Sequence, residues 1–449
     1  MKILICSKLF YPSNSIGAVR PSNFAKYLAE LGHEVVVVTE ETFGPQDYKL
    51  NVVDIIRVSN SPRVQRFIQI NQLRITKREK ANEASEFNHV TTKKSALQIK
   101  ITDPLRKFLS VSKSQLFMLF IESDWAFSSM QIIKKKYKKK YFDIVFSTYG
   151  PTGSHFLGYR IFKLGTARHW ISDLRDNMVN EDYPFWLNLF YKNAERKILN
   201  YAKIVTVVSE GQKTMFINNN KKYCPNTDKI FVVQNGYENQ FIPLQSNNKN
   251  QLIRIAYTGQ LYCGKRDFSM LFHVIDDLIG ENKIDTKHIE ILYAGPSSED
   301  LKLQISLFSN VKLICNDLGK VEREKALQIQ NESDLLVALT WNTRKEQGIL
   351  TGKFLEYIQA YKPIISLTCG NLANGELSAM VESLNLGIAC EYITYETDYI
   401  RLKEYIVLQY QHTLNGEVTN FSPDLIGIQK FHFQNITRNL NEIFMQILD

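Results

Sequence analysis

The chain has 449 residues, of which 44% are hydrophobic and 22% charged, and its net charge is +9. This length and composition are typical of a globular protein with two domains. No apolar run approaches the roughly 20 residues that span a bilayer, and the first strand-like segment, Met1–Ser7, is too short for a signal peptide. The six cysteines lack C-x-x-C spacing and nearby histidine pairs, which argues against a disulfide framework or a zinc site and predicts a cytoplasmic protein.

The first forty residues predict a strand–loop–helix–strand unit. Ile3 to Cys6 is a continuous apolar run, as a buried parallel strand requires. A loop from Lys8 to Arg20 follows, and a helix is expected from about Pro21. Val35 to Val38 then forms the second strand. The loop lacks the G-x-G-x-x-G fingerprint, which disfavours a dinucleotide-binding oxidoreductase.

Residues 61 to 140 change to long amphipathic and basic stretches, which we interpret as helices inserted in the first domain. Val64, Phe67, Ile68 and Ile75 share one helix face between arginines and lysines. Two interpretations are open: a basic helix lying on a membrane, or core packing. The run from Lys134 to Lys140 suits an anionic membrane surface, or simply cations at a helix end. No nucleic-acid-binding fold accompanies this charge, so no nucleic acid partner is expected.

The remainder of the first domain alternates short β-rich runs with helices. Trp125 is expected in the core, whereas Glu195 and Glu210 are expected on helix surfaces or caps. The predicted strands are Phe142–Ser147, Trp170–Ser172, Ile204–Val208 and Phe231–Asn235.

A second α/β series follows the linker candidate at residues 237–252. Its predicted strands are Arg254–Tyr257, Ile289–Ala294, Lys312–Cys315, Leu335–Leu339 and Ile364–Leu367, and an amphipathic helical segment covers Ile426–Leu448. The predicted fold is therefore α/β with two Rossmann-like domains, at 1–238 and 250–425, and a final helix at 426–449 packing back toward the first domain. Ligands bind such sheets beyond the carboxyl ends of the strands, so the site is expected in the cleft between the domains.

The segment from Gly348 to Pro363 is the most informative for function. A Gly/Thr loop with Lys353 opens a helix whose buried side carries Phe354 and Ile358, and Glu356 lies in its first turn. Backbone N–H groups at a helix start and a lysine suit a diphosphate, and the glutamate suits a ribose. An ordinary helix with a solvated glutamate is the alternative.

These pieces, in this order, resemble the GT-B glycosyltransferases of the large retaining class called family 4. The resemblance runs over nearly the full length, although each motif is loose. The segments that carry it are Tyr11 to Arg20, Leu28 to Val35, Phe142 to His155, Trp170 to Asp176, Ala202 to Ser209, Gln234 to Tyr237, Tyr257 to Lys265, Ala294–Gly295, Asp334 and Gly348 to Pro363.

The resemblance implies a nucleotide-diphosphate sugar, with UDP-sugar favoured, held by the second domain and an acceptor held by the first. Glu356 corresponds to the ribose-binding glutamate, and Lys265 and Lys353 are the cationic candidates for the diphosphate and for catalysis. The base is expected at the main chain of Gly319 to Val321. Other donor-binding positions are Gly17, Gly259, Leu350, Thr351, Gly352 and Glu346.

Two positions depart from the family pattern. The family places a glutamate eight residues before Glu356, where this chain has Gly348; Glu346 lies two residues earlier. An arginine that often follows the glycine of the first donor-domain strand is Gln260 here. Whether Glu346 replaces the missing glutamate is open, and a non-catalytic copy of the fold remains an alternative.

The first domain contributes candidates for sugar or acceptor contact: His155, Arg20, Asp173, Arg175 and Asp176. A packed histidine and a structural Arg–Asp pair are the alternatives.

The expected reaction is retaining transfer to a hydroxyl of a saccharide or lipid-linked saccharide in surface polysaccharide assembly. It would need no metal and no cofactor beyond the donor, and the basic insert suggests contact with the inner face of the cytoplasmic membrane. A nucleotide-sugar 2-epimerase is a further alternative.

Overall fold

The computed structural model describes most of the chain as two compact units. The described residues are 1–13, 15–41, 53–71, 103–179 (without the side chains of 103–111), 183–224, 226–238, 251–417 and 421–447. Unit 1 comprises Met1–Val207, Asn220–Phe231 and Phe444–Asp449, and unit 2 comprises Val208–Asn219 and Val232–Ile443. The predicted domain limits and the predicted cleft stay predictions.

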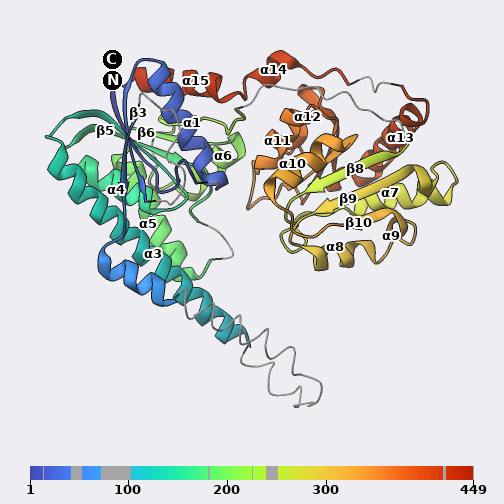
Figure 1. Ribbon diagram of the computed structural model, residues 1–449, viewed down its shortest axis with the longest axis horizontal. Helices are drawn as coiled ribbons and strands as arrows, with labels where there is room; N and C mark the ends of the chain where they lie inside the picture. Colours follow the sequence, from blue (N-terminus) through green and yellow to red (C-terminus); the bar gives the residue numbers. More distant parts are fainter. Residues whose placement is uncertain are drawn as a thin grey trace. The chain divides into compact units, whose positions relative to one another are not determined.

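Unit 1 is built on a seven-stranded sheet with helices on its faces (Figure 1). The pairs from β3 through β6 are parallel. In spatial order the strands are β3 (Val53–Val58), β2 (Glu34–Glu40), β1 (Lys2–Cys6), β4 (Phe142–Thr148), β5 (Ala167–Leu174), β6 (Ile204–Val207) and β7 (Ile230–Val232). Residues 3 to 6 are fully buried, as the continuous apolar run predicted.

The described helices of unit 1 include one that starts earlier than predicted. Helix α1 (Ile16–Glu30) begins five residues before Pro21, because the Ser15 side chain caps it by accepting from the Gly17 N–H at 3.2 Å. Pro21 therefore lies inside the helix rather than at its start. The other labelled helices are α3 (Asp103–Lys136), α4 (Gly153–Lys163) and α5 (Phe185–Tyr201).

The described parts of the segment predicted as a helical insert are mainly helical. Residues 62–71 are helical, and α3 is a single helix of 34 residues that ends on Lys134, Lys135 and Lys136. Val64 is buried while Phe67 is 46% exposed, and Ile75 lies outside the described residues. No helix in the described part of the chain is long and apolar enough to cross a membrane.

Unit 2 has a six-stranded parallel sheet between two buried apolar clusters. Its strands in spatial order are β10 (Cys315–Asp317), β9 (Ile289–Ala294), β8 (Ile253–Thr258), β11 (Leu335–Trp341), β12 (Ile364–Cys369) and β13 (Gly387–Glu391). The strand predicted at 312–315 is wrong: residues Val311–Ile314 form the short helix α9, and the strand begins only at Cys315.

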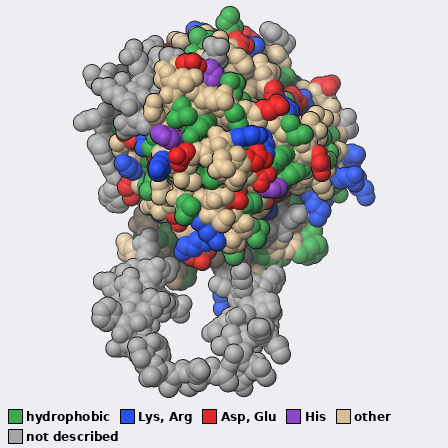
Figure 2. All heavy atoms as spheres, turned by 90° about the vertical axis from the view of Figure 1, so that its right-hand side faces the viewer, with side chains coloured by type: hydrophobic (Ala, Val, Ile, Leu, Met, Phe, Trp, Pro, Cys, Tyr) green, Lys and Arg blue, Asp and Glu red, His purple; other side chains and the backbone are tan. Residues whose placement is uncertain are grey.

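The described helices assigned to unit 2 are α6 (Glu210–Asn219), α7 (Ser269–Gly280), α8 (Ser298–Ile305), α10 (Arg323–Glu332), α11 (Gly352–Ala360), α12 (Glu376–Ser383), α13 (Tyr395–Leu414), α14 (Leu425–Gln429) and α15 (Phe433–Met445), whose end belongs to unit 1. The segment predicted as one amphipathic stretch near the end of the chain is thus divided into α14 and α15. Figure 2 shows the side of unit 2 that carries α7 and α13, where acidic and basic side chains are interspersed.

Candidate functional site

The predicted diphosphate-binding helix of unit 2 has the expected local structure. Thr351 is its N-cap, with the side chain accepting from the Phe354 N–H at 3.4 Å, and α11 then runs to Ala360. Phe354 and Ile358 are 1% exposed, so the apolar side faces the core. An α-helix leaves its first N–H groups without intrahelical partners, and this helix starts beyond the carboxyl end of β11, where parallel sheets bind ligands.

Glu356 lies in a polar cluster formed by two neighbouring helices. Its carboxylate accepts from Lys353 Nζ at 2.8 Å and from Gln330 Nε2 of α10 at 3.1 Å, and Arg323 Nη2 lies 3.8 Å away. The Glu356 side chain is 11% exposed, whereas Lys353 and Arg323 are 31% and 49% exposed. The carboxylate is therefore held in place while both cations remain accessible to an anionic ligand.

A second lysine–carboxylate pair lies at the end of β11. Glu346 accepts from the indole Nε1 of Trp341 at 2.7 Å and from Lys265 Nζ at 3.1 Å. A turn fixes the backbone of Glu346, since its N–H donates to Thr343 Oγ1 at 3.0 Å. Lys265 comes from the loop after β8, which passes through Gly259, so the structure brings the two predicted residues Lys265 and Glu346 together.

Close packing surrounds Gly348, the position at which the resemblance leads one to expect a glutamate. Gly348 has a φ of 67°, and a Cβ there would lie 2.3 Å from Ser209 Oγ and 2.8 Å from the Cα of Gly211 in α6. Ser209 Oγ also donates to the Gly348 carbonyl at 2.8 Å. No side chain fits this position without displacing α6.

In unit 1, Arg20 and Asp173 form a buried ion pair. Arg20 donates from Nε and Nη2 to the two oxygens of Asp173 at 3.0 and 2.8 Å, and both residues are at most 2% exposed. Thr148 and Thr206 donate to the same carboxylate at 2.7 and 2.6 Å. Burial alone would raise the pKa of Asp173, but the charge of Arg20 and these hydrogen bonds outweigh it and lower the pKa. This geometry supports the structural alternative for the pair.

Arg175 connects the loops at the carboxyl ends of the central strands. Its guanidinium donates to the carbonyls of Tyr149 and Gly17, each at 2.6 Å, and to that of Gly150. The Gly17 carbonyl would normally accept from the N–H four residues later, which Pro21 lacks. The proline thus leaves an acceptor for Arg175, and the neighbouring Asp176 is exposed.

His155 lies in the interior of unit 1, in the first turn of α4. Ser147 Oγ is 2.8 Å from its Nδ1, and Ser172 Oγ is 3.4 Å from its Nε2. Burial lowers the pKa of His155 to about 3, so the ring is neutral near pH 7. Neither of these contacts joins His155 to the loops that Arg175 connects. The predicted contact of His155 with a sugar stays a prediction.

Glu195 of α5 was wrongly predicted on a helix surface. Its side chain is 3% exposed and accepts from Asn220 Nδ2 at 2.8 Å. Burial raises its pKa to about 7. The prediction failed because one charged residue in a helix pattern does not reveal which segment, here the one at Asn220, packs over it.

Sequence reasoning missed three residues of the unit 2 cluster. Arg323 and Gln330 belong to α10, and Trp341 ends β11. The Trp341 side chain packs near Lys265, whose Nζ lies 5.4 Å from the ring centroid. A polar residue on the helix before a sheet strand carries no signal of its own, whereas a tryptophan at the end of an apolar strand could have been noticed as a site candidate.

Comparison with known proteins shows the fold. No protein-family model and no curated protein sequence matches this chain. Among solved structures, Anabaena HepE in complex with UDP-glucose matches with 13% identity and a TM-score of 0.55, covering 99% of this chain and all of that one. The lipopolysaccharide outer core galactosyltransferase WaaB matches with 14% identity and a TM-score of 0.55 over both full chains. A trehalose-phosphate synthase of Burkholderia xenovorans matches with 10% identity and a TM-score of 0.59, over all of this chain and 99% of that one. The fold is α/β and of the GT-B class, as predicted.

Proposed function

We propose that the protein transfers a sugar from a nucleotide diphosphate, most simply a UDP-sugar, to a hydroxyl acceptor with retention of configuration. The observation that carries this proposal is the pair of lysine–carboxylate contacts in unit 2, Lys265–Glu346 and Lys353–Glu356. Both lie at the carboxyl ends of parallel strands, one of them at a helix N-terminus. Neighbours of the same fold include a UDP-glucose complex, which supports the choice of ligand.

The proposed donor contacts follow from the chemistry of these groups. Glu356 accepts from the ribose hydroxyls, while Lys265, Lys353 and the backbone N–H groups of the 350–352 loop bind the diphosphate. Arg323, which is 49% exposed beside Glu356, is a further cation for the nucleotide. Glu346, held by Trp341, is proposed to accept from hydroxyls of the transferred sugar in place of the glutamate that Gly348 cannot carry.

The chemical step in this proposal is carried by the leaving group. The bond between the anomeric carbon and the diphosphate oxygen breaks, and negative charge develops on the diphosphate. Two preorganised cations stabilise this charge more in the transition state than in the bound substrate. The departing phosphate oxygen accepts the acceptor's hydroxyl proton as the new glycosidic bond forms.

The acceptor side of the proposal rests on unit 1. Arg175 is half-buried and Asp176 is exposed, so both are proposed to contact the acceptor. The buried pair of Arg20 and Asp173 supports the loops that carry them from the core of unit 1. We propose a saccharide or lipid-linked saccharide as acceptor and a location at the inner face of the cytoplasmic membrane. No metal or additional cofactor is part of the proposal.

The first test is a thermal-shift panel with UDP, GDP, ADP, CMP, NAD and the common UDP- and GDP-sugars. A ligand at about a hundred times its Kd stabilises by roughly 2.7 kcal/mol, which gives a readable shift. Glu356→Gln is expected to weaken the shift, and Glu299→Gln, which changes an exposed carboxylate of α8, is the matched control. The preferred sugar nucleotide then enters a transfer assay that measures release of the nucleotide diphosphate.

The outcomes separate the alternatives. A selective nucleotide shift with transfer to an added acceptor supports the proposal. Binding without transfer supports a non-catalytic copy of the fold, and epimerisation of the donor sugar without an acceptor supports the 2-epimerase. No shift with any nucleotide, in a protein that melts cooperatively, counts against the donor site itself.

A further inference from the structure

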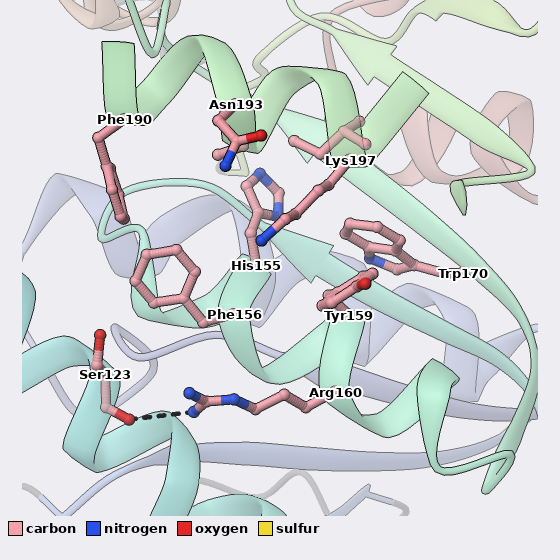
Figure 3. Close-up of a pocket in the computed structure, with 11 residues that line it drawn as sticks. Ser123, His155, Phe156, Tyr159, Arg160, Trp170, Phe190, Asn193 and Lys197 are labelled. Carbon is pink, nitrogen blue, oxygen red and sulfur yellow. Dashed lines mark hydrogen bonds between the residues drawn. The ribbon is translucent and has the colours of Figure 1, made fainter. Parts of the chain in front are cut away.

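A cavity of about 270 Å³ lies in unit 1, between α3, α4 and α5 (Figure 3). His155, the candidate for sugar contact, belongs to its lining, and the donor and acceptor contacts proposed above use no other lining residue. Its size is near the lower end of the range for small-molecule pockets, roughly 300–1,000 Å³. The walls are largely aromatic, and two cations belong to the lining. The residues concerned are Phe156, Tyr159, Trp170 and Phe190, with Arg160 and Lys197.

The two cations of this cavity have no carboxylate partner among the contacts that the structure describes. Arg160 Nη1 donates to the Ser123 carbonyl at 3.1 Å, and Lys197 extends from α5 into the cavity. The described carboxylates of these helices are engaged elsewhere. Glu122 accepts from the Gly153 N–H at 2.9 Å, Asp124 from Ser61, and Glu195 from Asn220. The positive charge at the cavity is therefore available to an anion.

Exposed apolar side chains continue from the cavity over the outer faces of two helices. On α3, Leu116, Phe120 and Phe127 are 50–55% exposed, and their spacing places them on one face with the lining residue Ser123. On α5, Phe185 and Leu189 are 78% and 51% exposed. They precede the lining residues Asn193 and Lys197 at intervals of four residues, so they also share one helix face.

Helices α3 and α5, which carry these two apolar faces, contact each other in unit 1. Trp186 Nε1 of α5 donates to Ser112 Oγ of α3 at 3.3 Å, and the rings of Phe156 and Phe190 lie 5.9 Å apart across α4 and α5. Helical faces that combine large apolar side chains with lysine and arginine are typical of the bilayer interface. A soluble ligand that binds in the cavity would not explain why large apolar side chains outside the cavity are exposed, whereas a membrane surface would.

We infer that this surface docks on a membrane and that the cavity takes up part of one anionic phospholipid. The apolar residues of α3 and α5 enter the acyl region, a segment of acyl chain packs between the aromatic walls, and the lipid phosphate pairs with Arg160 and Lys197. The inference deepens the membrane location proposed above but does not depend on transferase activity, so lipid binding and sugar transfer can each fail without the other.

The membrane arm of the test is co-sedimentation with vesicles. Vesicles of phosphatidylcholine alone are compared with vesicles of equal parts phosphatidylcholine and phosphatidylglycerol. The full-length protein is expected to partition onto the second kind, and Arg160→Gln/Lys197→Gln to reduce the partition coefficient roughly 30-fold. Lys197→Gln alone, at an exposed position, gives a smaller loss without risk to folding. The control is Lys302→Gln/Lys312→Gln, which removes the same charge from the surface of unit 2.

The second arm distinguishes a lipid from a free phosphate. Dihexanoyl-phosphatidylglycerol, which is soluble, is expected to raise the melting temperature of the protein, and glycerol phosphate is not. Ala194→Phe, which fills the cavity, is expected to abolish that shift while leaving the melting of the free protein cooperative. Equal shifts with glycerol phosphate would overturn the lipid assignment. Equal sedimentation of the cavity and control variants, or no binding to either vesicle, would overturn the docking surface.

Discussion

The ion pairs of the two units differ in how accessible their charged side chains are to a ligand. Arg20–Asp173 in unit 1 is almost completely buried, and four hydrogen bonds satisfy the carboxylate. In unit 2, Lys265 and Lys353 are 38% and 31% exposed although each pairs with a carboxylate. A buried pair cannot exchange partners without exposing an uncompensated charge, whereas a half-exposed lysine can turn to an incoming anion. The first kind of pair builds a scaffold and the second kind builds a binding site.

The largest effect is expected from breaking the buried pair. Asp173→Asn leaves the Arg20 guanidinium buried without its counter-charge, which costs about 3–5 kcal/mol of unfolding free energy. Urea unfolding followed by circular dichroism measures this loss. Glu299→Gln, at an exposed carboxylate of α8, is the control and is expected to change stability by less than about 0.5 kcal/mol. Equal stability of the two variants would contradict a scaffold role for Asp173.

Breaking an exposed pair is expected to affect transfer instead of folding. Lys265→Met keeps the aliphatic stem but removes the cation, so we expect a 10²–10³-fold lower kcat and little loss of stability. Initial rates with the sugar nucleotide identified by thermal shift measure this. Lys302→Met, in the exposed pair with Glu299, is the control. An equal loss of stability in Lys265→Met and Asp173→Asn would contradict the view that the exposed pair serves binding while the buried pair serves folding.

A third experiment concerns Glu195, a buried carboxylate of unit 1 that, unlike Asp173, has no ion pair among the described contacts. Glu195 has a pKa raised to about 7 by burial, above the value of 4.5 expected in the unfolded chain. A raised folded-state pKa contributes stability below the unfolded value that is lost as the pH rises through the folded value. From pH 5 to 7 the wild type is expected to lose about 2 kcal/mol relative to Glu195→Gln.

Urea unfolding at several pH values measures that difference between the wild type and Glu195→Gln. Glu290→Gln, which changes a more accessible carboxylate paired with Arg254, is the control and should follow the wild-type profile over this range. Parallel profiles for wild type and Glu195→Gln would show that Glu195 is ionised in the folded protein.

The sheets could be predicted from the sequence because buried parallel strands are short, continuous apolar runs, such as residues 3–6. The errors in element boundaries arose where one local preference competed with another. Pro21 was taken as a helix start because proline favours the first turn, but the serine cap at Ser15 starts α1 earlier. In the same way, the apolar residues at Val311 and Ile314 form a helical turn just before the strand that they were predicted to join.

The site was predictable only where its parts are close in sequence. Thr351, Lys353 and Glu356 lie within one helix start, and the Lys–Glu spacing of three residues places both side chains on one face. By contrast, Gln330 reaches Glu356 from α10, and Trp341 orients Glu346 from the end of a strand. Such contacts depend on how the elements pack, which no local pattern in one sequence encodes.

The proline within α1 has a consequence for sequence variation. Because Pro21 cannot donate to the Gly17 carbonyl, that oxygen is left for Arg175, about 150 residues later in the chain. The two positions should therefore covary among homologues: an alanine at 21 would restore the helical bond and relax selection on the arginine. A combined Pro21→Ala and Arg175→Met protein should accordingly be more stable than the sum of the two single changes implies, as a double-mutant cycle would measure.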